Sequence, residues 1–375
     1  MARAHRTRLV SHIECPGGGQ VWVDGATLFV AHMRPPAGTS IFDIADPSAP
    51  RLLSHVEMPA GWHSHKVRAR DGLMIVNHER LGSDNPDYGG GLGLYDVSRP
   101  AAPRLVNKWR TAGSGVHRYD FDGRHAYISP TAEGFVGNIV MILDLADPSK
   151  PIEAGRWWIP GQNAAAGEAY PWDGYVKPRC HHPLRMGDRL YVSYWHHGLF
   201  ILDIADLAHP RMVAALNSSP AHPHPTHTCL PVPQPLMGRQ IMVVADEDVA
   251  KLRPSPPAFA WVYDITDERQ PMPIATCRVP GLDMDGAPQP PMTGCHQPSE
   301  VFSGTVIPFA WFAQGLRLFD IADPFAPREI GSYEPDLPSG CERVSSNDVT
   351  MDGRGLIYLT DRQHGVDIIE FLGET

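Results

Sequence analysis

The sequence predicts an all-β fold in which seven four-stranded units close into a ring, and three observations support this prediction. The 375 residues include 35 Gly and 38 Pro, a share that favours short strands joined by turns over long helices. A strand–turn–strand segment recurs along the chain about once in every 50 residues, the kind of period that marks a repeat architecture. The first and last segments of the chain each form part of one such unit.

Each repeated segment consists of a strand, a turn that usually carries Asp and Pro, and a second strand. In Asp46-Pro47, Asp147-Pro148 and Asp323-Pro324 the Asp side chain can bond the backbone two residues on, while Pro presets φ, so the chain reverses direction there. We expect these carboxylates to be structural. Six copies of the segment begin at Ile41, Leu94, Ile142, Ile201, Val262 and Leu318.

A seventh copy begins near Asp367 and ends before its second strand. The missing strand is found near the N-terminus, where RLVSHIECP from Arg8 matches RLLSHVEMP from Arg51 almost letter for letter. Two further short strands lie between consecutive copies, for example RLYVSYW after Gly187. We therefore predict one domain, residues 1–375, that is a seven-bladed β-propeller whose last blade is completed by the N-terminal strand.

The FDIADPxxPRLIG-like core of the repeat resembles the LVIVD-repeat propellers, and the resemblance covers nearly the whole chain. It implies the propeller fold. It implies little about activity, because propellers carry many unrelated functions.

Charge and motifs exclude several classes of function. The chain has 42 acidic and 32 basic residues and no Lys/Arg run interleaved with aromatic residues, so we expect no nucleic-acid partner. We expect no membrane association and a cytoplasmic location, because the sequence has no long apolar stretch and no signal-peptide core. The six cysteines form no CxxC pair, and their distribution suits a reducing compartment. No GxGxxG after a strand, Walker loop, GxSxG or HExxH occurs, which argues against a nucleotide cofactor and nucleophilic hydrolysis.

Histidine is unusually frequent, with 19 residues, and most of them fall on one predicted face of the ring, the face of the b-to-c loops and d-to-a links. When the starts of the seven innermost strands are aligned, one position holds His in five blades, Gly19 in the first and Asn347 in the last. A position repeated around the ring places its side chains at the central axis. The five histidines are His65, His117, His181, His227 and His296.

Imidazoles that converge from separate blades predict a transition-metal site. Imidazole nitrogen suits Fe, Cu and Zn, whereas Mg and Ca prefer oxygen. We favour Fe or Cu as the metal, with Zn or Mn as alternatives. If no metal binds, the alternative is a hydrated channel lined by histidines. Three or four histidines should bind, since a catalytic site keeps a position open. His117, His181, His227 and His296 are favoured over His65, whose neighbour His63 could replace it.

Further candidates surround this position. Carboxylates that could orient the ligand rings are Asp120, Glu300, Asp348, Glu79, Glu133 and Glu247. The candidate catalytic residues are Glu300, Glu247 and His78, and the candidate substrate-binding residues are Trp62, Arg80, Trp195 and Arg362. These aromatic and basic side chains favour a small-molecule substrate that is aromatic or anionic.

We compare three hypotheses for function. The first is an Fe or Cu oxygenase or oxidase that acts on a small organic molecule, similar in layout, though in no sequence motif, to carotenoid-cleaving dioxygenases and selenium-binding methanethiol oxidases. The second is a Zn or Mn hydrolase or lyase, and the third is a non-catalytic propeller that binds a protein partner. The sequence carries no signal for the oligomeric state.

Overall fold

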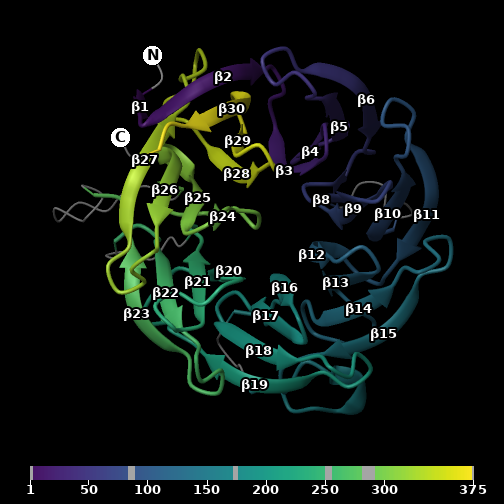
Figure 1. Cartoon of the computed structure of the whole chain (residues 1–375). Coiled ribbons are helices and arrows are strands. Elements are labelled where there is room, and N and C mark those ends of the chain that lie inside the picture. Colours follow the sequence, from purple (N-terminus) through teal and green to yellow (C-terminus); the bar gives the residue numbers. More distant parts are fainter. Residues whose placement is uncertain (1–2, 83–88, 172–175, 250–255, 281–291, 374–375) are drawn as a thin grey trace.

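The computed structural model describes residues 3–82, 89–171, 176–249, 256–280 and 292–373. Its strands form seven antiparallel sheets arranged as blades around a central axis, as Figure 1 shows. The prediction of an all-β, seven-bladed propeller is therefore confirmed. Within the described residues no helix is long and apolar enough to cross a membrane.

The blades follow one another along the chain, and each is ordered from the axis outward. Blade 1 consists of β3 (Gly18–Asp24), β4 (Thr27–His32), β5 (Ala37–Asp43) and β6 (Arg51–Glu57). Blade 2 consists of β7 (Trp62–His63) with β8 (Val67–Arg70), then β9 (Leu73–Arg80), β10 (Gly91–Asp96) and β11 (Arg104–Arg110). Blade 3 consists of β12 (Val116–Phe121), β13 (His125–Pro130), β14 (Val140–Asp144) and β15 (Ile152–Trp157). Blades 4 and 5 consist of β16 (His182–Met186), β17 (Arg189–Ser193), β18 (Leu199–Asp203) and β19 (Arg211–Leu216); and β20 (Thr226–Pro231), β21 (Ile241–Asp246), β22 (Ala260–Asp264) and β23 (Met272–Cys277). Blade 6 consists of β24 (Gln297–Pro298), β25 (Val306–Trp311), β26 (Gly315–Asp320) and β27 (Arg328–Glu334), and blade 7 of β28 (Ser346–Met351), β29 (Leu356–Asp361), β30 (Gly365–Phe371) and β2 (Thr7–Ile13).

The two ends of the chain close the ring together. Strand β2 pairs antiparallel with β30, so that Leu9 lies opposite Ile369 and His12 lies opposite Asp367. The N-terminal strand thus completes the last blade, as predicted. A short strand that we did not predict, β1 (Arg3–His5), pairs with β27 and adds a fifth strand to the rim of blade 6.

The Asp-Pro turns form as the sequence indicates. The Oδ1 atoms of Asp46, Asp147 and Asp323 each accept a hydrogen bond from the backbone N–H two residues on, at 2.9 to 3.0 Å. These carboxylates lie in turns far from the axis and serve the backbone. They are structural rather than catalytic.

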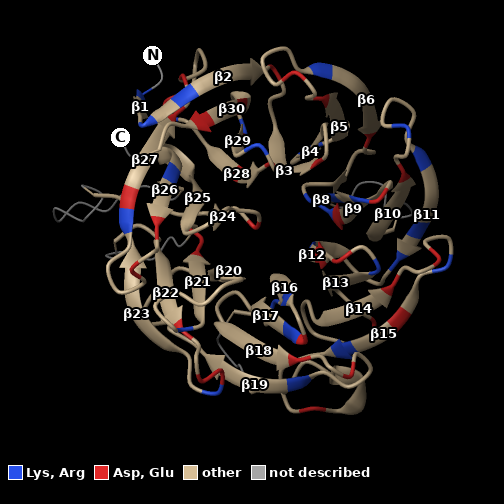
Figure 2. Cartoon of the chain, in the orientation of Figure 1, with Lys and Arg blue, Asp and Glu red and all other residues tan. Residues whose placement is uncertain are grey.

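Apolar side chains fill the spaces between neighbouring blades, and polar side chains line the axis. Tyr191 and Ile201 of blade 4, for example, pack against Val244 of blade 5. Figure 2 shows that charged residues occur on the outer strands and also on segments that border the centre of the ring, near β8 and β12. Lys66, which directly precedes β8, and Arg118, on β12, are both buried.

The innermost strands are irregular at the aligned position. The pairing of the inner strand with its neighbour shifts register between Gly18 and Gln20, Val116 and Tyr119, Thr226 and Thr228, and Ser346 and Asp348. A β-bulge inserts an extra residue and re-aims side chains. In these four blades the register shift therefore falls at the aligned residue or next to it.

The closure of the ring generates the first prediction. Deletion of residues 1–13 removes β2 and leaves the edge of β30 unpaired, so we expect the midpoint of thermal unfolding to fall by at least about 5 °C. Deletion of residues 1–5 removes only the exposed strand β1 and should change the midpoint far less. Equal midpoints for the two truncated proteins, measured by circular dichroism, would contradict this role of β2.

Candidate metal centre

Five histidine rings form a continuous arc at the axis of the propeller. The centroids of consecutive rings lie 4.7 Å apart for His65–His117 and His117–His181, 4.4 Å for His181–His227 and 4.5 Å for His227–His296. Each ring comes from a different blade, so the aligned position predicted from the sequence does converge on one place. His63 does not replace His65 but stacks on it, with a centroid separation of 4.5 Å.

The two blades without histidine at this position support the arc. A Cβ atom added to Gly19 would lie 2.8 Å from both the Cβ and the carbonyl oxygen of His65. Glycine at position 19 therefore leaves the space that the His65 ring and backbone occupy. In the last blade Asn347 donates a hydrogen bond to the carbonyl of Gly19 and accepts one from the Nε of Arg362 at 2.7 Å.

Hydrogen bonds fix the direction of three of the rings. Nδ1 of His181 faces the carbonyl oxygen of His227 at 2.9 Å, Nδ1 of His296 faces the carbonyl oxygen of Asn347, and Nδ1 of His117 lies 2.7 Å from a carboxylate oxygen of Glu79. These partners only accept, so each Nδ1 must carry the hydrogen. In a neutral ring the lone pair is then on Nε2, the atom that faces the cavity.

The pair formed by His117 and His181 shows the consequence. Their Nε2 atoms lie 3.0 Å apart, yet neither carries a hydrogen in the neutral tautomers just assigned. Burial is the main cause that lowers the pKa of both rings well below the usual value, and the nearby Arg118 and Arg179 guanidiniums lower it further. Two lone pairs therefore face one another, an arrangement that a bound cation stabilises.

The remaining two rings differ from one another. Nδ1 of His65 accepts from the side-chain amide of Asn77 at 3.1 Å, so its Nε2 carries the hydrogen and is a donor rather than a ligand. Nδ1 of His227 lies 2.7 Å from the Thr228 hydroxyl, which can donate or accept. Nε2 of His227 is buried without a hydrogen-bond partner among the described residues, as is Nε2 of His65. Nε2 of His117, His181, His227 and His296 thus remain as the imidazole nitrogens of the arc that could bind a metal.

Two predicted orienting carboxylates lie at the arc. Glu79 contacts His63 at 2.9 Å and His117 at 2.7 Å. Burial would raise the pKa of Glu79, but its hydrogen bond with His63 and the nearby Arg179 guanidinium hold that pKa below its usual value. Glu247 lies 3.9 Å from Nε2 of His227 and 3.6 Å from Nε2 of His296. Burial raises the pKa of Glu247. One ligand atom from each of His181, His227 and Glu247 falls within a 4.8 Å span.

The arc forms the wall of a cavity of about 270 Å³. Trp195 closes one side, with its ring 4.7 Å from that of His181 and a backbone φ of 56° that a bulky residue rarely adopts. Three guanidinium groups also line the cavity, those of Arg118, Arg179 and Arg362. The cavity therefore combines imidazole nitrogens with a cationic and aromatic wall.

Several predicted site residues lie elsewhere. Glu300 is not beside the arc, because it comes four residues after His296 and lies deeper along the axis. There it pairs with Lys66 at 2.9 Å and with Arg68. Glu300 also lines a second cavity, of about 320 Å³. The second cavity is also lined by Asp120. Asp348 accepts from the backbone N–H of Val21, and burial raises its pKa.

His78, Trp62 and Arg80 belong to blade 2 and do not line the histidine cavity. Side chains alternate along β9, so Asn77 and Glu79 face the arc while His78 lies on the opposite side, against Gly93 and Tyr95. Trp62 is buried in the cross-strand pair that it forms with Arg80, and Arg80 is exposed, as is Glu133. The structure therefore places His78, Trp62 and Arg80, which the sequence analysis grouped with the site, away from the arc.

Sequence reasoning gave Arg118 no role. It directly follows His117, and simple alternation would turn it away from the axis, but the register shift between Val116 and Tyr119 turns both residues inward. The pKa of Arg118 is lowered to about 10, mainly by burial. A bulge of this kind has no reliable signal in a single sequence.

The comparisons with known proteins agree with this architecture. The LVIVD repeat model matches residues 123–158 and 186–217, which lie in blades 3 and 4. The chain thus contains LVIVD repeats, and its seven-bladed fold is consistent with a family of LVIVD-repeat propellers. No curated protein matches the chain.

Solved structures show similarity in fold alone. U3-55K superposes with a TM-score of 0.61 at 9% identity, over 97% of this chain and 98% of that chain. A 6-phosphogluconolactonase, designated putative, from Bacteroides uniformis gives a TM-score of 0.60 at 10% identity, over 86% and 87%. The computationally designed Ika8 protein gives 0.52 at 8% identity, over 96% and 98%. At these identities only the fold is comparable.

The burial of His78 leads to a prediction on acid stability. Burial, with a smaller contribution from Lys108, lowers the pKa of His78 to about 3. Below about pH 6.5 the unfolded chain takes up a proton at this side chain that the folded protein does not, so the free energy of unfolding falls as the pH falls, by about 1.4 kcal/mol per pH unit. His78→Asn should remove this contribution from the slope between about pH 6 and pH 4, measured by urea unfolding.

The control for this measurement is the exposed His209. His209→Asn should leave the slope unchanged, because the side chain of His209 is 81% exposed. Parallel slopes for wild type and His78→Asn would show that His78 is not buried as a neutral ring.

Proposed function

We propose that this LVIVD-repeat propeller is a metal-dependent oxygenase or oxidase that binds Fe or Cu at the axis and oxidises a small anionic organic molecule with dioxygen. The ligands are Nε2 atoms of His117, His181, His227 and His296. One observation carries the proposal, the 3.0 Å approach of the Nε2 atoms of His117 and His181, two rings whose Nδ1 atoms both face acceptors. A divalent cation between such rings relieves the repulsion of their lone pairs.

The donor atoms suit a redox-active first-row metal. Imidazole nitrogen binds Fe, Cu and Zn, and neutral rings leave the full charge of the ion in place. A bound Fe or Cu ion supplies the one-electron and dioxygen chemistry. The separation of 3.0 Å is close to the ~3 Å that separates adjacent nitrogens bonded at about 2.0–2.1 Å.

The protein orients the metal ligands through neighbouring groups. Glu79 accepts the Nδ1 hydrogen of His117, and backbone carbonyls accept those of His181 and His296. Such partners fix both the tautomer and the angle of each ring. The hydrogen bonds at Nδ1 therefore leave Nε2 of His117, His181 and His296 as the nitrogen that can bind the ion.

The cavity wall supports an anionic substrate. Arg179 lies over the Trp195 ring at 5.0 Å, and Arg362 is held by its hydrogen bond to Asn347. Guanidinium groups bind carboxylates and similar oxyanions through paired hydrogen bonds. Trp195 offers a flat surface for the organic part of the substrate.

Glu247 is the carboxylate placed to accept a proton from the substrate. Its oxygens lie close to the Nε2 atoms of His227 and His296, and it lines the cavity that would hold the substrate. We no longer propose Glu300 or His78 for this role, because both lie away from the cavity.

We also propose a reducing compartment such as the cytoplasm. All six cysteines are free thiols, and five of them are buried. Disulfides are rare where thiols are kept reduced.

The first test is elemental analysis of the protein purified without a His tag. We expect about one Fe or Cu ion per chain, retained in His209→Ala and lost in His181→Ala and in His227→Ala, because each of the latter removes a ligand. Oxygen consumption should follow metal content across small carboxylates offered as substrates. A colourless protein with one Zn or Mn ion that is lost in His181→Ala, and with no oxygen consumption, would favour a hydrolase or lyase instead. Absence of any metal that depends on His181 and His227 would overturn the proposal.

The second test concerns the positioning residue Glu79. Glu79→Gln keeps the size of the side chain but removes the charge that orients His117, so we expect metal affinity to fall by about 10- to 100-fold. The matched control is Glu133→Gln, an exposed glutamate, which should leave affinity unchanged. Competition with a chelator of known affinity measures both. Equal affinities for the two variants would show that Glu79 does not orient a ligand.

A further inference from the structure

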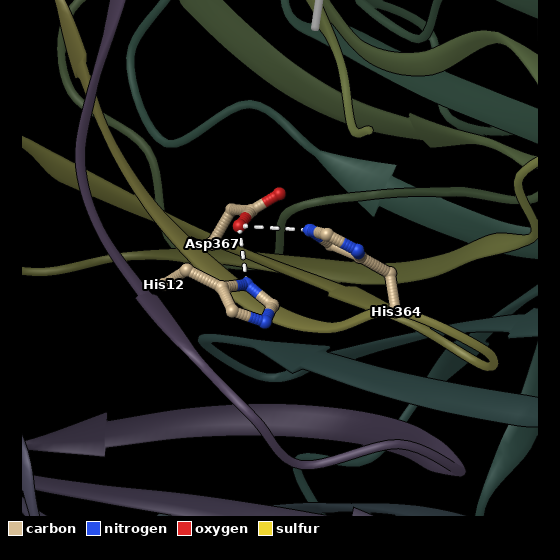
Figure 3. Close-up of side chains that lie close together, drawn as sticks. All are labelled: His12, His364 and Asp367. Atoms are coloured by element: carbon tan, nitrogen blue, oxygen red, sulfur yellow. Dashed lines mark hydrogen bonds and ion pairs between the residues drawn. The ribbon is translucent and has the colours of Figure 1, made fainter. Parts of the chain in front are cut away.

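A second group of metal-ligating side chains lies where the two ends of the chain meet. It consists of His12 on β2, Asp367 on β30 and His364 in the turn between β29 and β30. His12 and Asp367 are direct cross-strand partners in the pairing that closes the ring. Figure 3 shows both imidazoles pointing at the same carboxylate.

The three side chains are close enough to share one ion. Nδ1 of His12 lies 2.8 Å, and Nε2 of His364 lies 3.5 Å, from the same oxygen of Asp367. The two rings are 4.2 Å apart, and one ligand atom from each residue falls within a span of 4.8 Å. Ligand atoms bonded to zinc at about 2.0–2.1 Å lie roughly 3 Å from one another, so only small side-chain shifts are needed.

The exposure of the three residues suits a site that a metal can enter from solvent. The side chains of His12 and His364 are 28% and 17% exposed, whereas that of Asp367 is 1% exposed. Oδ2 of Asp367 is buried, and the Tyr333 hydroxyl lies near this carboxylate. A second carboxylate, on Glu14, lies 3.6 Å from Nε2 of His12.

We propose that His12, His364 and Asp367 form a second transition-metal site, of the two-histidine, one-carboxylate type, that fastens the ring closure. Two imidazoles and a carboxylate suit Zn and related divalent ions, with water in the open positions. Because the ligands come from both ends of the chain, the ion binds only when β2 is paired with β30. Binding therefore stabilises the closed ring. This site is separate from the axial centre and does not depend on it.

The test uses Zn²⁺ and the full chain, in a background that lacks axial ligands. In the double variant His181→Ala/His227→Ala, after treatment with a chelator, we expect one Zn²⁺ per chain by calorimetric titration. The midpoint of thermal unfolding should rise by about 3 °C at a hundredfold excess over the dissociation constant. Adding His364→Ala should abolish both effects, whereas adding His209→Ala should abolish neither, although His209 also contacts a carboxylate, that of Asp206.

A second measurement keeps the proposal falsifiable if the double variant does not fold. In wild type, Zn²⁺ should slow hydrogen exchange of backbone amides in β2, and in His364→Ala it should not. The proposal is overturned if His364→Ala binds as many Zn²⁺ ions as wild type, or if Zn²⁺ leaves exchange in β2 unchanged. The three residues would then form a hydrogen-bonded triad only.

Discussion

The structure at the centre of this protein depends on the contact of five imidazole rings at the axis, each from a different blade. Burial keeps the rings neutral, and the fixed acceptors behind His117, His181 and His296 decide which nitrogen of each carries the hydrogen. The lone pairs then face inward, where the separation between His117 and His181 is only that of a hydrogen bond. The arrangement is costly for a dry polar channel and favourable for a cation site.

The surrounding features follow from this contact. Gly19 is present because His65 occupies the space that a Cβ atom would need. The bulges on the inner strands turn consecutive residues inward, which places Arg118 directly behind the arc. Positive groups beside neutral imidazoles help to keep the rings unprotonated, and the same positive groups attract an anion into the cavity.

Sequence patterns were sufficient for the architecture and for the identity of the arc, because both depend on repetition. The six copies of the Asp-Pro segment and the split seventh copy predicted the blades and their closure, and the aligned position predicted the histidines. The surroundings were harder to predict. His78 was assigned to the site because it lies in the correct loop region, but strand alternation turns Asn77 and Glu79, not His78, toward the axis. Glu300 was placed by its proximity to His296, whereas buried Lys66 and Arg68 hold it deeper in the molecule.

The split last blade also has a consequence for how the chain is made. Residues 7–13 leave the ribosome long before their partner strand, residues 365–371, is synthesised. Until then β2 has no edge to join, and an unpaired strand is open to association with other chains. Arg8, Ser11 and His12 give this strand a polar surface that limits such association while the six other blades fold. The arc of histidines spans blades 2 to 6, so a nascent chain can bring the axial histidines together before β2 joins β30.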